Sequence, residues 1–285
     1  AKGSSRLVSG KGSRPVETHL SGGGLAAAWG WVALVLVVSI GIPYFSIIAS
    51  SLIKLRGYGL APGNFTLEHY AELFTTDRSL GAIGNSIFLA IASACICSVL
   101  GTVVVMAVRR GKGQLKKIVE GASMLPEMLP AIVLVIGIML FWNAIYDVLP
   151  LYNTMGIMVL AYVVLYLPYT VQYVTSSFTQ INDNLIQAGR TFGGSPWYVF
   201  RRITLPMIVP GILTGWMMIF IIAFRELVTA SLIAPPNVLV VSTYINREFE
   251  QGSVSLGMAM AVLCVAITTT TLLILNAVTS RKKAS

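Results

Sequence analysis

Charged residues are scarce in this sequence. Asp, Glu, Lys and Arg together make up 11% of its 285 residues, whereas soluble globular domains carry about 25%. Apolar residues reach 55%, and the mean hydropathy is +0.78. So few charges cannot cover the surface of a water-soluble protein of this size, and the composition therefore predicts an integral membrane protein.

Histidine and cysteine are also rare, and their positions predict no metal or redox site. The two histidines, His19 and His69, are far apart in the sequence. The three cysteines, Cys95, Cys97 and Cys264, lie inside apolar runs, where a small buried thiol more often packs than binds a metal.

Sequence motifs for nucleotide binding and catalysis are missing. There is no Gly-x4-Gly-Lys-Ser/Thr phosphate-binding loop, and the Gly-Lys-Gly strings at 10–12 and 111–113 are too short to form one. No Gly-x-Ser-x-Gly, His-Glu-x-x-His or paired-carboxylate pattern is present. We therefore expect that the chain is not an enzyme, binds no ATP and carries no cofactor of its own.

Long apolar segments dominate the sequence, near residues 25–53, 82–108, 120–142, 155–178, 205–233 and 253–279. Each is long enough to cross a hydrocarbon core of about 30 Å as a helix. The predicted fold is therefore all-α, a polytopic membrane protein whose six transmembrane helices occupy residues 25–280. Pro43 is expected to kink the first helix. Residues 1–24 are predicted to be a flexible basic segment, and residues 281–285 a basic tail.

The net charge of +9 could indicate a nucleic-acid partner, but the basic residues flank the apolar segments, as topology signals do. Fifteen Lys and Arg fall in the segments on one side, which include both ends of the chain, and four fall on the other. Because the Lys- and Arg-rich side of a membrane protein is cytosolic, both termini and residues 181–204 are predicted to be cytosolic. We expect a lipid membrane, and no nucleic acid, as a partner.

A polar stretch, residues 181–206, separates the fourth and fifth apolar segments. Its pattern predicts two short amphipathic helices, the first capped by Asp183 and ended by the glycine pair at 193–194. The second begins with Ser195 as the N-cap and Pro196 in the first helical position. Their apolar and aromatic side chains predict contact with a partner protein, or else with the membrane interface. These side chains are Leu185, Ile186, Ala188, Phe192, Trp197, Tyr198, Phe200 and Ile203.

The spacing within this stretch resembles a known pattern. The string Gln187-Ala188-Gly189, three residues, Gly193, nine residues and Ile203-x-Leu205-Pro206 resembles the EAA loop of MetI-like, type I ABC importer permeases. The family pattern is Glu-Ala-Ala-x3-Gly-x9-Ile-x-Leu-Pro, and this chain departs from it at positions 187 and 189. The resemblance implies a cytosolic coupling helix that docks into a groove of an ATPase subunit.

The same resemblance implies a set of coupling residues and a set of partners. The coupling residues are Asp183, Gln187, Ala188, Gly189, Gly193, Leu205 and Pro206. The partners are two ABC ATPase subunits that bind ATP-Mg, a second permease half, and a periplasmic or lipid-anchored solute-binding protein. The chain would then be a permease half-subunit in the bacterial cytoplasmic (inner) membrane, and its spans would switch between inward- and outward-facing states as the ATPases close.

Two further resemblances concern the substrate. The string from Val8 to Pro15 resembles the linker inside fused, two-half permeases of the ferric-iron type, which implies that the chain is the second half of such a protein. The string from Phe224 to Leu227 resembles the RELP-type segment of iron-type permeases, although Val228 stands where they have proline. Ferric iron is therefore the first expectation for the substrate. An organic anion, such as a phosphonate or a sugar phosphate, is the alternative.

Charged residues also fall within the predicted spans. Arg225 and Glu226 lie in the outer half of the fifth, and Glu127 lies between two prolines near the inner start of the third. Charges at this depth are costly and usually face protein or a water-filled cavity. Arg225 and Glu226 are predicted either to line the translocation path or to form structural ion pairs. Glu127 is predicted either to line the path or to lie at the membrane interface.

A channel or secondary transporter without an ATPase is the alternative function. Secondary transporters often contain internal repeats and interrupted spans. No strong repeat relates the two halves of this sequence, and such a function would leave the aromatic helix pair at 181–206 unexplained. Co-purification with an ATPase distinguishes the two hypotheses.

Overall fold

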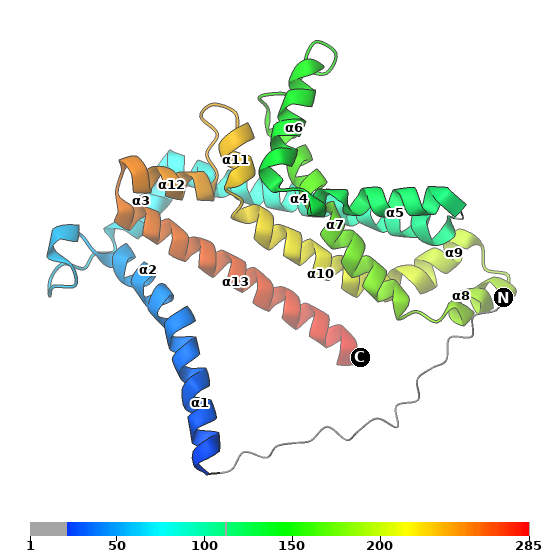
Figure 1. The fold of residues 1–285 in the computed structure, drawn as a ribbon, viewed down its shortest axis with the longest axis horizontal. Helices are drawn as coiled ribbons and strands as arrows, with labels where there is room; N and C mark the ends of the chain where they lie inside the picture. The colour runs from blue at the N-terminus through cyan, green and yellow to red at the C-terminus, as the bar shows by residue number, and fades with distance from the viewer. Residues whose placement is uncertain (1–21, 112, 285) are drawn as a thin grey trace. The chain divides into compact units, whose positions relative to one another are not determined.

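The computed structural model describes residues 22–111 and 113–284 (Figure 1). Most of the segment predicted to be flexible, residues 1–21, lies outside the described residues. Throughout the described part the regular elements are helices, and an antiparallel bridge between Ile53 and Phe65 is isolated. The prediction of an all-α fold is confirmed. The chain divides into two units, residues 1–46 and 47–285.

The first unit contains α1 (Gly23–Leu36), a π-helical turn (Val37–Gly41) and the start of α2 (Ile42–Leu52). The π-helical turn ends two residues before Pro43, where the sequence predicts a kink. Proline has no N–H, and its ring crowds the carbonyl four residues earlier, so a wider turn at that point relieves the clash. Residues 23–52 together are long and apolar enough to cross a membrane.

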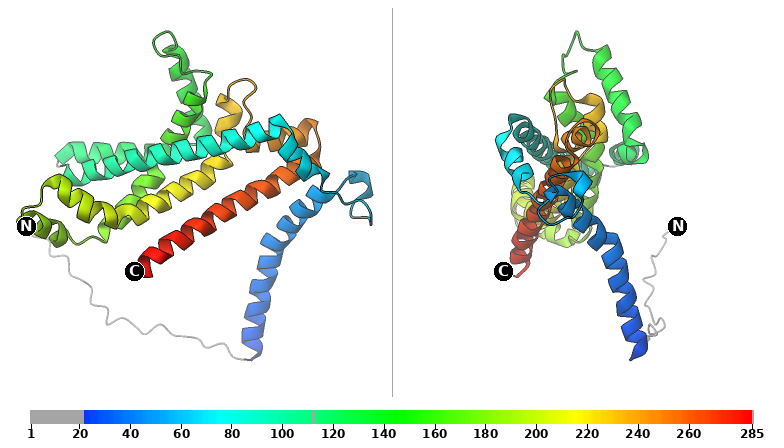
Figure 2. Two further views of the ribbon diagram at one scale, coloured as in Figure 1. Left: turned by 180° about the vertical axis from the view of Figure 1, so that it is seen from behind. Right: turned by 90° about the vertical axis from the view of Figure 1, so that its left-hand side faces the viewer.

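The second unit is built around three long helices, α4 (Asp77–Arg110), α7 (Met155–Thr179) and α10 (Leu205–Phe224), which pack against one another (Figure 2). Small residues let their backbones approach closely. A Cβ on Gly101 of α4 would lie 2.6 Å from Thr170 Cγ2 of α7, and a Cβ on Gly215 of α10 would lie 3.1 Å from Thr170 Cα. Buried apolar side chains of the three helices belong to one core cluster, which includes Leu89, Ala94, Met158, Tyr162, Ile219 and Phe220.

The third predicted span is broken. The chain bends by 110° between α5 (Gly113–Met128) and α6 (Ala131–Ala144), as Figure 1 shows. Pro130 disfavours the helical conformation of the residue before it and cannot donate a helical hydrogen bond, so the helix stops there. The prediction of one helix over 120–142 is therefore wrong. Among the described residues, five helices are long and apolar enough to span a membrane, and the bent pair makes a sixth only if it counts as one span.

The fifth predicted span has different limits at both ends. α9 (Pro196–Val199) and a second π-helical turn (Phe200–Thr204) lead without a break into α10, so the second short amphipathic helix is the start of the span. This turn also ends two residues before a proline, Pro206. At the other end α10 stops at Phe224, and α11 (Val228–Ile233) is a separate helix. A continuous span to residue 233 is therefore wrong.

Five further elements belong to the second unit. They are a short 3-10 turn (Arg56–Tyr58), α3 (Glu68–Thr75), α8 (Asp183–Thr191), α12 (Val241–Gln251) and α13 (Val254–Ala284). Two hydrogen bonds tie α4 to the start of α12: Asn85 Nδ2 donates to the Leu239 carbonyl at 2.9 Å, and the Val241 N–H donates to Ser86 Oγ at 2.8 Å. α13 continues to Ala284, through most of the segment predicted to be a tail.

Candidate functional site

The stretch predicted to dock on a partner connects α7 to α10. Its first helix, α8, begins at Asp183, and the N-cap is Asn182, whose Oδ1 accepts a hydrogen bond from the Asn184 N–H at 3.0 Å. The prediction that Asp183 caps this helix is therefore wrong by one residue. Asn182 has the extended backbone that an N-cap requires, with ψ at 123°, whereas Asp183 is already helical.

A tight turn ends α8. Gly193 has a φ of +83°, in the left-handed region that favours glycine. Its N–H donates to the Arg190 carbonyl at 2.9 Å, and the Gly194 N–H donates to the Gly189 carbonyl at 3.1 Å. These bonds satisfy carbonyls that the end of a helix leaves without partners. The predicted break at 193–194 is confirmed.

The second helix of the pair begins as the sequence predicts. Ser195 is its N-cap, and Ser195 Oγ accepts a hydrogen bond from the Tyr198 N–H at 3.2 Å. Pro196 occupies the first helical position, where its missing N–H costs nothing. α9 continues through a π-helical turn into α10, so this helix and the span form one continuous helical segment.

Close packing at Gly189 holds the two helices together. A Cβ at this position would lie 2.6 Å from Ile203 Cδ1 and 3.3 Å from Val199 Cγ2. Real Cβ atoms essentially never approach another heavy atom to 2.6 Å, so the Ile203 side chain would have to move. The departure from the EAA pattern at position 189 thus coincides with a contact that has no room for a side chain.

The outer surface of the helix pair is apolar and exposed. Phe192 is 91% exposed, Trp197 is 67% exposed and Tyr198 is 56% exposed. Aromatic side chains that gather on an exposed surface favour contact with another protein. We name as the docking surface the exposed residues Leu185, Gln187, Ala188, Phe192, Trp197 and Tyr198. Of the other predicted coupling residues, Leu205 is half-buried and Pro206 is exposed at the start of α10.

Arg225 and Glu226 lie at the other end of α10, between helices rather than inside a continuous span. Glu226 Oε2 accepts a hydrogen bond from the Tyr166 hydroxyl of α7 at 2.7 Å. Glu226 Oε1 accepts from the N–H and the Oγ1 of Thr229, at 3.0 and 3.1 Å. The carboxylate therefore lies at the N-terminus of α11, where the helix dipole favours an anion. Arg225 is exposed, and a path-lining role for either residue stays a prediction.

Replacing Glu226 with alanine is expected to destabilise the packing of α11 against α7, because it leaves the Tyr166 hydroxyl and Thr229 without their acceptor. Losing hydrogen bonds to a charged group should lower the free energy of unfolding by about 1.5–3 kcal/mol. Glu226→Gln keeps an acceptor oxygen and should cost about 1 kcal/mol or less. Unfolding in mixed detergent–SDS micelles measures both losses, and equal losses would contradict a role for the carboxylate charge.

Glu127 lies in the last turn of α5, just before the bend. Gln172 Nε2 of α7 donates a hydrogen bond to Glu127 Oε2 at 2.5 Å, and Gln172 also lines a cavity of about 470 Å³ between these helices. The Glu127 side chain is exposed. Both predicted roles, lining the path and lying at the interface, are compatible with this position and stay predictions.

The sequence pattern does not indicate the partners of these two carboxylates. Tyr166 and Gln172 both lie on α7, which the pattern predicts only as an apolar span. Polar side chains within such a span were the available signal, because at that depth they face protein or a cavity. The identity of the carboxylate that each one meets depends on how α7 packs against α5 and α10.

Several known permeases are similar in sequence to this chain. It is 29% identical over 232 residues to the Fe(3+)-transport system permease protein FbpB 2 of Haemophilus influenzae, a match that covers 80% of this chain and 42% of that protein. The chain thus spans less than half the length of this relative. PhnV of Salmonella typhi, named for 2-aminoethylphosphonate transport, is 24% identical over 242 residues, covering 85% of this chain and 91% of PhnV.

Solved ABC transporters have the same fold. The chain matches a bacterial ABC transporter involved in import of the acidic polysaccharide alginate with a TM-score of 0.72 and 16% identity, over 90% of this chain and 95% of that one. It also matches the MetNI methionine ABC transporter in inward-facing conformations, with a TM-score of 0.55 and 15% identity, over 72% of this chain and 97% of that one. The chain therefore has the MetI-like permease fold.

Family membership follows from the sequence itself. Residues 98–285 match the family described as binding-protein-dependent transport system inner membrane component, which is more than half of the chain and includes the whole connection between α7 and α10. The chain therefore belongs to this family of multi-pass inner-membrane proteins, the permease components of binding-protein-dependent ABC importers.

Proposed function

We propose that α8 and the turn after it are the coupling site through which this permease responds to ATPase subunits. The observation that supports this most is the construction of the site: glycines at 189 and 193 fix a compact helix pair, and the pair presents exposed aromatics. Because α9 is continuous with α10, a push on the docking surface tilts a central membrane helix. Residues 181–206 then lie in the cytosol, and so do both termini.

The partners that this function requires are two ATPase subunits that bind ATP-Mg, a second permease half and a solute-binding protein. The similar structures support them: one is the MetNI methionine ABC transporter, and another is the alginate ABC transporter in complex with an alginate pentasaccharide-bound periplasmic protein. Family membership speaks against the alternative of a channel or secondary transporter that needs no ATPase. In this proposal the chain provides the translocation path and not the hydrolysis.

Replacing Phe192 with aspartate is expected to separate the permease from its ATPase. Phe192 is the most exposed of the large apolar side chains on the docking surface, and an aspartate buried there at an interface would lose its hydration. Loss of a central aromatic contact typically weakens an interface about 30-fold. Affinity purification of the chain from native membranes, with the ATPase quantified by immunoblot, measures the change.

The matched control is Phe74→Asp, because Phe74 is also an exposed aromatic, 57% exposed, but lies on α3 and outside the docking surface. This variant should retain the ATPase at the wild-type level. If Phe192→Asp co-purifies with as much ATPase as the wild-type chain does, the proposed coupling site is contradicted. Loss with both variants would also contradict it, because the effect would not be specific to α8.

Ferric iron is the substrate that we propose, in a chain that forms the second half of a two-half permease. The iron permease relative supports this, since the match covers 80% of this chain and only 42% of that protein, as expected for one half of a fused pair. An organic anion is the alternative substrate. PhnV supports it, because the match covers 85% of this chain and 91% of PhnV. Uptake of radioactive ferric iron and of radioactive 2-aminoethylphosphonate by cells with and without the gene distinguishes the two.

A further inference from the structure

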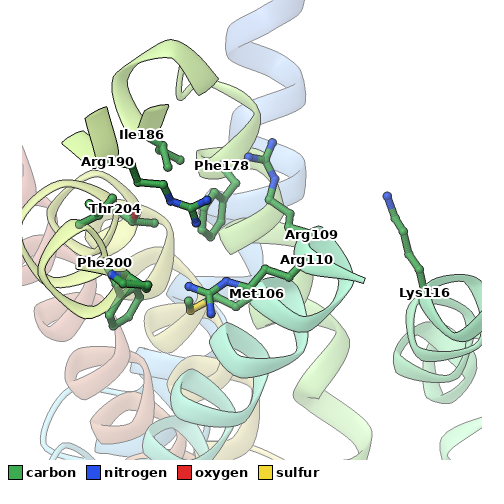
Figure 3. A pocket seen from close by; sticks show the side chains of 11 residues that line it. Met106, Arg109, Arg110, Lys116, Phe178, Ile186, Arg190, Phe200 and Thr204 are labelled. Carbon is green, nitrogen blue, oxygen red and sulfur yellow. The ribbon is translucent and has the colours of Figure 1, made fainter. Parts of the chain in front are cut away.

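Basic residues from three helices line one pocket near the docking surface. The pocket has a volume of about 300 Å³, and its basic residues are Arg109 and Arg110 at the end of α4, Lys116 on α5 and Arg190 on α8. Figure 3 shows the side chains of Arg110 and Arg190 reaching toward the same space beside the ring of Phe178. The Arg109 guanidinium lies over that ring, 4.8 Å from its centroid.

The charge of this pocket favours an anion. The described residues that line it include no Asp or Glu. Arg110 and Arg190 carry like charges that repel one another, and an anion bound between them turns that repulsion into attraction. Arg guanidinium groups match phosphate oxygens especially well, because they donate two parallel hydrogen bonds.

An apolar groove continues from the basic pocket along the membrane span. It has a volume of about 640 Å³ and runs between α4 and α10, with Trp197 at its side. Met106, Arg110, Pro196 and Phe200 line both the groove and the pocket, so the two are contiguous. The α4 residues of the groove extend from Ser98 to Arg110, which is about 18 Å of helix at about 1.5 Å per residue. One leaflet of hydrocarbon is about 15 Å thick, so the groove has the length of an acyl chain.

We propose that this combined site binds an anionic phospholipid. Its phosphate lies between Arg110 and Arg190, and one acyl chain lies in the groove between α4 and α10. A lipid explains both halves of the site, whereas a soluble anion leaves the groove unexplained. Because Arg190 belongs to α8, a bound lipid links the coupling site to the end of α4. This last consequence rests on the proposed function, but the binding itself does not.

The experiment titrates the full-length chain in detergent with dioleoyl phosphatidylglycerol and measures the bound lipid by native mass spectrometry. Arg110→Gln and Arg190→Gln should each weaken binding about fivefold, because one basic residue near an anionic headgroup contributes about that factor. Arg202→Gln is the matched control, since Arg202 is exposed on the helix after α9 but does not line the pocket. It should leave binding unchanged. Dioleoyl phosphatidylcholine, which has the same acyl chains and no net charge, should bind at least about fivefold more weakly than phosphatidylglycerol.

A second pair of variants tests the groove. Val103→Trp fills it with a bulky side chain and should weaken phosphatidylglycerol binding, while Val133→Trp on α6, a similarly exposed position outside the groove, should not. Equal binding of the two lipids would overturn the proposal, and so would equal losses with Arg202→Gln and Arg110→Gln. Displacement of the lipid by equimolar inorganic phosphate, with no effect of Val103→Trp, would identify a soluble anion instead. These assays need no ATPase, so their failure is separate from a failure of the coupling proposal.

Discussion

ATP hydrolysis that is stimulated by the solute-binding protein is expected to fall to the basal rate when Gly189 is replaced with leucine. A Cβ alone would lie 2.6 Å from Ile203 Cδ1, and leucine adds three further carbon atoms in the same direction. Overpacking of this kind costs about 1–3 kcal/mol, which the helix pair can avoid by moving α8 away from α9. The docking surface would then keep its residues but lose its shape. Purified complexes reconstituted in vesicles measure both hydrolysis and uptake.

Gly121→Leu is the matched control for this experiment. Gly121 lies inside α5, where a Cβ would meet nothing within 4 Å, so leucine there should be tolerated. Gly189→Ala should give an intermediate result, because its single methyl group meets the flexible tip of Ile203. Stimulated hydrolysis at the wild-type rate in Gly189→Leu would mean that the close contact between α8 and α9 has no part in coupling.

Replacing Gly101 with leucine is expected to prevent stable folding of the membrane-spanning unit. A Cβ at Gly101 would lie 2.6 Å from Thr170 Cγ2, 2.8 Å from Thr170 Cβ and 3.4 Å from the backbone nitrogen of Val171. Thr170 cannot retreat, because it is fully buried and Gly215 of α10 packs against it on another side. The larger side chain must therefore push α4 away from α7, at a cost of about 3 kcal/mol or more. Thermal unfolding in detergent and the yield of monodisperse protein measure this loss.

Gly84→Leu provides the comparison within the same helix. A Cβ at Gly84 would meet nothing within 4 Å, so this variant should unfold at nearly the wild-type temperature. A similar loss of stability in both variants would show that leucine is harmful anywhere in α4. In that case the contact between Gly101 and Thr170 would not be the feature that holds α4 and α7 together.

Local signals in the sequence predicted the class of the protein and the position of its candidate site. The scarcity of charge and the long apolar segments indicated a membrane-spanning helical protein. The hydrocarbon core of a bilayer contains no water to pair with backbone N–H and C=O groups, and a helix pairs these groups internally. The break at 193–194 and the cap at Ser195 were also predictable, because they depend on the conformations that glycine and serine favour within a few residues. The spacing from position 187 to Pro206 located the connection that the family shares.

Tertiary structure alone decided which residues meet. The 110° bend after Met128 and the end of α10 at Phe224 interrupt segments that are long and apolar enough in the sequence to predict single spans. The hydrogen bond from Tyr166 to Glu226 joins residues 60 positions apart. The pocket between Arg110 and Arg190 and the groove beside it exist only because the end of α4 lies near α8 and near the start of α10. The hydropathy of a residue indicates how favourably it leaves water. It does not indicate which neighbouring helix packs against that residue, or at what angle.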